Sequence, residues 1–268
     1  MNAEELVQAG RLDEALASLQ DSVRAQPADA RLRVFLFQLL SVMGQWDRAM
    51  TQLQVLGDMD ASSMMLAQIF RPVLQCEALR AEVFAGNRTP IVFGEPAEWV
   101  GWLVQANQLV AKGEFAAARA LREKAFEAAP AVAGKLNDAA FEWIADADPR
   151  LGPVLEVIVV GRYCWAPFYR IKVITVPPPA DLRDLVWTPA QFTWTNGGTV
   201  SGHIPSRYPG TETAADGLLR LARKTEWLPK NDDLYLGVGQ RLLTTDQSEI
   251  PLFEVRQIEF AGPETAAV

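Results

Sequence analysis

The sequence has few of the residues that bind metals or form disulfides. Its 268 residues include two cysteines, Cys76 and Cys164, and a single histidine, with no CxxC motif. Metal centres built on sulfur and imidazole need such residues in clusters with short spacings. This scarcity argues against a zinc site and a disulfide scaffold, and we expect both thiols to be free and structural. We expect no metal site and no cofactor.

Sequence signals for membrane insertion, nucleic-acid binding and common catalytic motifs are missing as well. The N-terminus, MNAEELVQAGRLDEAL, lacks a basic start followed by an apolar run, and no stretch of about 20 apolar residues occurs. We therefore expect a cytoplasmic protein without membrane contact. A formal net charge of −8 argues against nucleic acid as a partner, because that affinity depends on clustered Lys and Arg. The nucleotide-phosphate motif GxxxxGK[ST] and the esterase motif GxSxG are also absent.

The N-terminal half instead contains a repeat. Gly10 opens GRLDEALASLQ, Gly44 opens GQWDRAMTQLQ and Gly113 opens GEFAAARALRE, each followed by apolar residues at helical spacing. The first two glycines are 34 residues apart, which is the period of the tetratricopeptide repeat. The third lies 69 residues further on, leaving room for one degenerate unit around SSMMLAQIFRPVLQCEALRAEVFAG. We predict four helix-turn-helix units.

The small residues of the repeat have a packing role. An alanine stands five positions after each glycine, where paired helices approach closely, at Ala15, Ala49 and Ala118. Stacked helix pairs leave a concave face, lined by the first helix of each unit, that commonly receives a peptide or a helix. In this register we predict partner contacts from Arg31, Val34, Gln38, Leu103 and Asn107, with Ser41 and Val100 beside them. The alternative is that these side chains only fill the array or contact the second domain.

The C-terminal half has a different pattern. Short runs rich in β-branched and aromatic residues, such as PVLEVIVVG and YRIKVITV, alternate with turn-forming clusters such as VPPPAD and TNGG. TWTNGGTV indicates a hairpin whose Asn-Gly pair accepts positive φ at both turn positions. We expect a multidomain α+β protein, with a tetratricopeptide-like helical array over residues 1–145 and a small, β-rich, barrel-like domain over residues 146–268.

WIADADPRLGPVLEV, residues 143–157, lies where the two halves meet. Two aspartates separated by one alanine could be part of a metal loop or an acid/base pair. An EF-hand loop counted from Asp146 needs Gly at the sixth position and Glu at the twelfth, but Leu151 and Val157 stand there. We favour a domain joint, in which a helix ends before Pro149 and Arg150 neutralises a carboxylate.

The phrases WIADADPRLGPVLEVIVVGRYCWAPF, DLRDLVWTPA, IPSRYPGTE and KTEWLP, following a short helical array, resemble the ImpE family, also called TagJ or SciE. These are accessory proteins of bacterial type VI secretion systems. The resemblance implies a cytoplasmic, non-enzymatic protein that binds the N-terminal helical segment of the small (TssB/VipA-like) subunit of the contractile sheath. It also implies a link to the ClpV-type AAA+ unfoldase that recycles contracted sheath.

The position of such a partner stays open at this point. The array face, the junction between array and β-rich domain, or an exposed face of that domain could each hold a helix, and we favour the first two. The alternative function is an enzyme of unknown reaction with its site in the C-terminal domain. Its candidate residues are Asp146, Asp148, Arg150, Tyr163 and His203. An enzyme needs several of these groups to converge on one pocket, whereas an adaptor needs an apolar groove.

Overall fold

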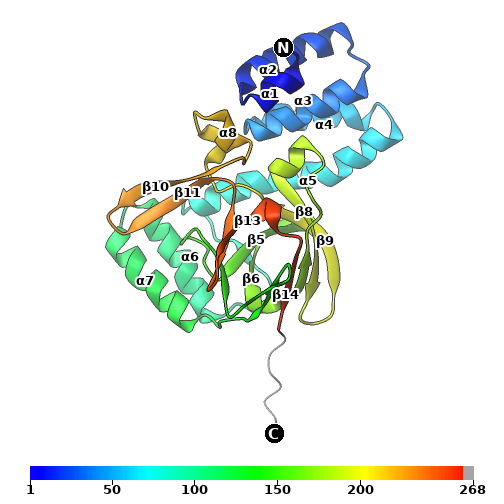
Figure 1. The fold of residues 1–268 in the computed structure, drawn as a ribbon. Coiled ribbons are helices and arrows are strands. Elements are labelled where there is room, and N and C mark those ends of the chain that lie inside the picture. The colour runs from blue at the N-terminus through cyan, green and yellow to red at the C-terminus, as the bar shows by residue number, and fades with distance from the viewer. Residues whose placement is uncertain (262–268) are drawn as a thin grey trace.

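The computed structural model describes residues 1–261, and its N-terminal part is helical (Figure 1). Among the described residues no helix is both long enough and apolar enough to cross a membrane. The helices of the N-terminal part are α1 (Ala3–Gln8), α2 (Leu12–Ala25), α3 (Ala30–Val42), α4 (Trp46–Gly57), α5 (Ala61–Phe84), α6 (Glu98–Ala111) and α7 (Phe115–Ala128). They confirm the helical array that the repeat predicts.

The glycine and alanine positions of the repeat act as expected. Each repeat glycine has a positive φ, between 68° and 78°, and separates two helices: Gly10, Gly44 and Gly113. Each alanine five positions later is fully buried. Close helix pairing therefore accounts for the small residue at this position, because a larger side chain would push the helices apart.

The predicted third unit is wrong in detail, because it is one helix and not a pair. α5 runs unbroken for 24 residues, and the Asp60 side chain caps its start by accepting a hydrogen bond from the Ser63 amide. The stretch contains no glycine that would open a turn, and its one proline, Pro72, is accommodated inside the helix. α5 is therefore one continuous helix in place of the predicted pair.

The C-terminal part is rich in strands, as predicted. Its main sheet has nine strands in the order β1-β6-β5-β9-β8-β7-β14-β2-β3. These strands are β1 (Ile91–Val92), β2 (Gly134–Leu136), β3 (Ala139–Phe141), β5 (Val154–Val159), β6 (Arg162–Pro167), β7 (Ile171–Thr175), β8 (Trp187–Trp194), β9 (Thr199–Pro205) and β14 (Gln257–Phe260). β1 and β3 do not pair, so within residues 1–261 the sheet is open and not a closed barrel.

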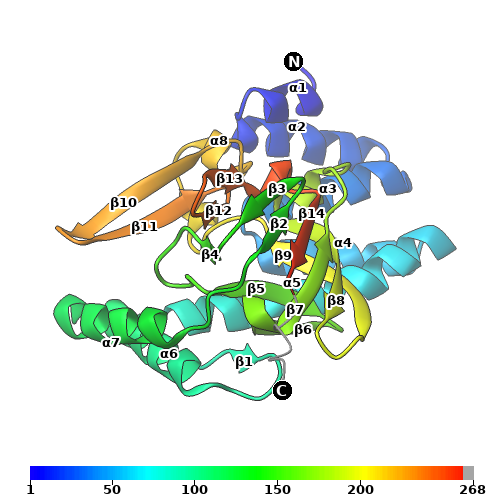
Figure 2. The same cartoon turned by 60° about the horizontal axis from the view of Figure 1, so that its bottom comes forward.

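Two smaller sheets complete this part. One contains β4 (Ile144–Asp146), β12 (Leu242–Thr245) and β13 (Glu249–Pro251). The other is the hairpin of β10 (Thr225–Asn231) and β11 (Leu234–Gly239), which projects from the body of the molecule (Figures 1 and 2). The short helices are α8 (Gly217–Arg220) and the 3₁₀ turns Phe168–Arg170, Leu182–Leu185, Thr211–Thr213 and Leu252–Glu254.

The predicted hairpin around TWTNGGTV is present as β8 and β9. Its turn differs from the expected one. The loop is closed by a bond from the Trp194 amide to the Gly198 carbonyl, and only Gly197 of the Asn-Gly pair has a positive φ. The Asn196 side chain accepts a bond from the Gly198 amide. A longer loop therefore forms in place of the two-residue turn.

The helix predicted to end before Pro149 is also wrong. Residues 134–146 form β2, β3 and β4, and β2 pairs with β14 near the other end of the chain. A Cβ at Gly134 would collide with the Glu259 carbonyl, so the glycine permits this close approach. The change from helix to strand lies between Ala128 and Gly134.

The helices and the strands share a core. One buried cluster contains Phe37 and Leu103 from the helices together with Trp165 and Trp187 from the sheet. Trp187 lies 5.9 Å, centroid to centroid, from Phe70 on α5. In both views α5 lies between α3–α4 and the main sheet (Figures 1 and 2). The array therefore does not present a free inner face, because the chain's own strands cover it.

Candidate partner-binding site

The residues predicted on α3 for partner binding lie in different environments. The Arg31 side chain is 92% exposed and pairs with Asp29. Val34 is half-buried against the core, and Gln38 is buried. Arg31 and Val34 stay accessible, and a role for them in binding remains a prediction.

The residues predicted on α6 are inside the protein. Leu103 is fully buried in the shared core. Asn107 is 5% exposed, and its side-chain amide donates to the Arg150 carbonyl at 2.7 Å. In this structure both side chains are used in packing α6 onto the strand-rich part, so they do not form a concave surface with α3.

The inner end of α3 is also occupied. The Arg207 guanidinium, which follows β9, donates to the Val42 carbonyl at 2.7 Å and to the Ser41 carbonyl at 3.4 Å. The 3₁₀ turn Leu182–Leu185 packs beside α3. These contacts close the groove that a tetratricopeptide array of this kind usually leaves open.

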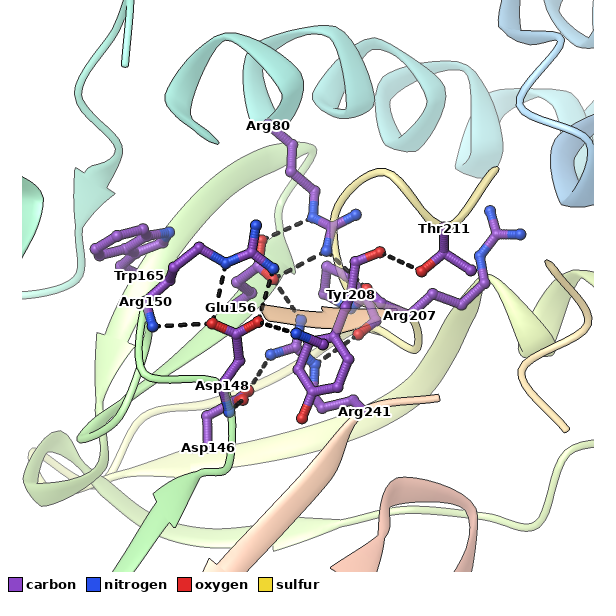
Figure 3. Close-up of polar contacts among 12 residues, drawn as sticks. Arg80, Asp146, Asp148, Arg150, Glu156, Trp165, Arg207, Tyr208, Thr211 and Arg241 are labelled. Atoms are coloured by element: carbon purple, nitrogen blue, oxygen red, sulfur yellow. Dashed lines mark hydrogen bonds and ion pairs between the residues drawn. The ribbon is translucent and has the colours of Figure 1, made fainter. Parts of the chain in front are cut away.

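Buried charges connect α5 to the sheet (Figure 3). Glu156 on β5 accepts from Arg80 on α5 at 2.7 and 3.0 Å, from Tyr163 at 2.6 Å, and from Arg241. Burial alone would raise the pKa of Glu156, but the Arg80 and Arg241 guanidinium groups lower it to about 2. Glu156 is therefore a buried carboxylate that stays charged.

The two aspartates of the joint belong to the same buried region. Asp146 pairs with Arg241, although burial raises the pKa of Asp146 to about 7. Asp148 accepts from the Arg150 guanidinium at 2.6 and 2.9 Å and from the Gly237 amide at 2.9 Å. The prediction that Arg150 neutralises a carboxylate at the joint is confirmed, and both aspartates are structural.

The residues considered for an enzyme site do not converge on one pocket. Tyr163, Asp146 and Asp148 are at most 2% exposed. Tyr163 donates to Glu156, Asp146 pairs with Arg241, and Asp148 pairs with Arg150. Arg150 and His203 each line a cavity, but the two cavities are different. Within the part of the chain that the structure describes, no three His, Cys, Asp or Glu side chains gather where a metal could bind.

An open groove lies at the junction of the array and the sheet. Its volume is about 650 Å³, and its walls come from the middle of α5, from β5, β7, β8 and β9, and from the turn after β5. The residues lining it are Gln68, Ile69, Pro72, Val73, Ile158, Val160, Gly161, Thr175, Pro177, Pro189, Ala190, Gln191, Ser201, Gly202 and His203. We call this feature the junction groove.

The junction groove contains no Lys, Arg, Asp or Glu, although these residues make up 22% of the chain. Its α5 wall is apolar at Ile69, which is 49% exposed, and at Pro72, three positions later. Met65, which is 63% exposed and four positions before Ile69, extends this apolar stripe along α5 beyond the lining of the groove. The i, i+4, i+7 spacing forms the ridge along which a second helix packs. Depletion of charge is typical of the centre of a protein interface.

His203 is the one titratable group lining the junction groove. Burial lowers the pKa of His203 to about 4, and its ring lies 5.4 Å from the Phe70 ring. The imidazole is therefore neutral near pH 7, and the groove carries no formal charge there. A partner surface that fits it is uncharged, with apolar side chains facing Ile69 and Pro72.

Comparison with known proteins agrees with this architecture. A family model described as ImpE protein matches residues 138–259, and a tetratricopeptide repeat model matches residues 6–69. Over 260 residues the chain is 55% identical to a Pseudomonas aeruginosa protein named type VI secretion system accessory component TagJ, covering 97% of this chain and 91% of that protein. The chain belongs to the ImpE family. The resemblance inferred from the C-terminal phrases is thus confirmed.

A solved structure supports the fold of this ImpE family member. The crystal structure of protein VPA1032 from Vibrio parahaemolyticus superposes with a TM-score of 0.88 at 25% sequence identity, and the match covers 97% of each chain. The match spans both the helices and the strands. The compact arrangement of array and sheet is therefore common to both proteins.

Sequence reasoning missed the junction groove as a set of residues. Its walls come from α5 and four strands, so no short motif contains it. One usable signal was present, because Met65 and Ile69 are apolar residues four apart in a helix whose other faces are also apolar. An apolar residue on the solvent side of such a helix indicates a contact beyond the protein's own core.

Proposed function

We propose that this protein is an accessory component of a bacterial type VI secretion system that works as a non-enzymatic adaptor. Its partner in this proposal is the N-terminal helical segment of the small sheath subunit, and the helix binds in the junction groove. Support for the accessory role comes from the 55% identical relative, which is named type VI secretion system accessory component TagJ. The uncharged groove with its helical ridge is the single structural observation that carries the choice of site.

The shape and chemistry of the junction groove suit a helix. Amphipathic helices bind grooves through apolar side chains at i, i+3, i+4 and i+7. Ile69 and Pro72 offer the matching ridge on α5, which Met65 extends beyond the groove, and the sheet offers Ala190 and His203 as a floor. A bound helix would extend the α5 layer over the open part of the sheet, as helices do in layered α/β packing.

The link to the ClpV-type unfoldase belongs to the same proposal. An adaptor that holds the small sheath subunit would deliver or mark contracted sheath for that enzyme. Pull-down of the unfoldase by this protein, with and without the sheath subunit, tests the link. Capture that needs the sheath subunit would support an indirect contact, and capture without it would support a direct one.

The test of the adaptor proposal is fluorescence anisotropy with a labelled peptide of the sheath subunit's N-terminal segment. Ile69→Asp places a charge in the centre of the groove, so we expect at least about thirtyfold weaker binding than wild type. Leu228→Asp is the matched control, because Leu228 is 44% exposed on the projecting β10–β11 hairpin. Both variants should keep the wild-type melting temperature.

Each outcome has a definite meaning. Strong loss of peptide binding with Ile69→Asp and no loss with Leu228→Asp supports the junction groove as the binding site. Equal binding by wild type and Ile69→Asp moves the site to another surface, with Arg31 and Val34 on α3 as the next positions to substitute. No binding of the peptide by wild type removes the adaptor role, and the enzyme alternative must then be tested with substrates.

A further inference from the structure

Val160, at the edge of the junction groove, has an unusual backbone conformation. Its φ is +52°, and its side chain is 82% exposed. Among the described residues the other non-glycine positions with positive φ are Asn137 and Ala222, so Val160 is the β-branched one. A β-branched residue is strained in this region because its Cβ substituents crowd the neighbouring carbonyl groups.

The conformation follows from the turn that Val160 occupies. β5 and β6 pair as far as Val159 and Arg162, so Val160 and Gly161 form a two-residue turn. Both have positive φ, at 52° and 68°, as in a type I′ turn. Asn-Gly and Asp-Gly are the favoured sequences for such turns. The turn thus has valine where asparagine would be free of strain.

Packing inside the protein does not explain the valine. With 82% of its surface exposed, Val160 buries little apolar area against its own chain. Gly161 does have an internal reason, since a Cβ there would lie 2.9 Å from Pro72 on α5. The turn is therefore held against α5 by Gly161, and this contact directs Val160 to the rim of the junction groove.

The remaining groove residues indicate what Val160 would meet. Val160 lines the same cavity as Ile69 and His203, and the approach of Gly161 to Pro72 places its turn beside α5. A helix bound in the groove along α5 would meet both Ile69 and Val160. Strained residues occur where a local cost is retained for function, and burying an exposed apolar side chain against a partner gives such a function.

We infer that Val160 is an anchor for the partner in the junction groove, kept in a strained turn because its exposed side chain contacts an apolar helix there. This inference rests on the proposed function for the site and adds a residue that determines affinity. It predicts that relieving the strain makes the protein more stable and a weaker binder. If Val160 had no role in binding, relieving the strain would raise stability without weakening binding.

The experiment uses the full chain with three variants, Val160→Gly, Val160→Asn and Val160→Ile. Melting temperature and affinity for the labelled sheath-subunit peptide are measured for each. Gly and Asn accept positive φ, so both variants should melt roughly 2 °C or more above wild type. Both should bind the peptide about fivefold or more weakly, because the apolar anchor is gone. Ile keeps the side chain and should keep wild-type affinity without the gain in melting temperature.

Three outcomes would overturn the inference in distinguishable ways. If wild type binds the peptide and the Gly and Asn variants bind it equally well, Val160 is no anchor while the proposed function stands. If these variants melt no higher than wild type, the turn is not strained. If wild type does not bind the peptide, the proposed function fails together with the role of Val160.

Discussion

At the scale of single residues, buried arginines connect the two halves of the molecule. Arg241 is fully buried and pairs with both Asp146 and Glu156, and Arg80 reaches Glu156 from α5. Removing one member of such a group leaves an uncompensated buried charge, which is more harmful than losing an exposed ion pair.

Arg241→Ala should lower the free energy of unfolding by about 3–5 kcal/mol, because buried Asp146 loses its guanidinium partner and buried Glu156 keeps only Arg80. The measurement is urea unfolding followed by circular dichroism. Arg119→Ala is the control: Arg119 pairs with Glu123 and Asp233 on the surface, where water compensates both charges. Comparable losses in the two variants would contradict a special role for the buried network.

Glu156 should make the protein sensitive to acid. Its folded pKa of about 2 lies below the unfolded value of about 4.3, so its contribution to stability is complete above about pH 5 and is lost as pH falls toward 2. Between pH 5 and 3, wild type should lose stability more steeply than Glu156→Gln, by up to about 1.4 kcal/mol per pH unit. Parallel pH profiles of unfolding would show that Glu156 is not the group responsible.

Only the local part of this network was predictable from sequence. Asp148 and Arg150 are two residues apart, so their pairing follows from the spacing. Arg80 and Glu156 are separated by 76 residues and Arg241 and Asp146 by 95. Such pairs depend on how the sheet folds against α5, and one sequence carries no signal of that.

At the scale of elements, glycines define how closely helices and strands approach one another. In β11 a Cβ on Gly237 would collide with the Tyr208 ring, and the Gly237 amide donates to Asp148. In α6 a Cβ on Gly101 would face open space. Replacing glycine by alanine should therefore have opposite effects on stability in the two elements.

Gly237→Ala should lower the free energy of unfolding by about 1–3 kcal/mol through overpacking. Gly101→Ala should raise it by about 0.5–1 kcal/mol, because alanine loses less backbone entropy in a helix. Chemical denaturation of both variants beside wild type measures the difference. A stabilised Gly237→Ala protein would contradict the packing described for the hairpin.

Element prediction succeeded where patterns were local and failed where pairing was distant. The 34-residue period correctly marks α2 to α4, and the alternating runs correctly mark β5, β7, β8 and β9. Residues 134–146 are rich in alanine and look helical, but they pair as strands with β14 and β12. Distant strand partners outweighed local helix propensity there.

At the scale of the whole molecule, the array and the sheet behave as one folding unit in this account. Phe37, Phe70 and Trp187 pack in one core cluster across the boundary. The inner face of the array, which the repeat pattern predicts to be open, is filled by the chain's own strands. In the proposed function the partner therefore binds a surface that neither half forms alone.

Unfolding should accordingly be a single transition. Helix content measured by far-ultraviolet circular dichroism and tryptophan fluorescence, to which the buried Trp165 and Trp187 contribute, should change at the same denaturant concentration. Two separated transitions, with helix lost before or after the fluorescence change, would show that array and sheet fold independently.

The central claim is that the junction groove holds the helix of the small sheath subunit. Site-specific photo-crosslinking tests it most directly, with a photoreactive amino acid in place of Gln68, an exposed residue that lines the groove, or in place of Arg31 or Leu228, in the full chain and with the intact sheath subunit as partner. We predict a crosslink from position 68 to the subunit's N-terminal segment and none from position 228. A crosslink from position 31 alone, or none from position 68 while the two proteins bind, would contradict the central claim.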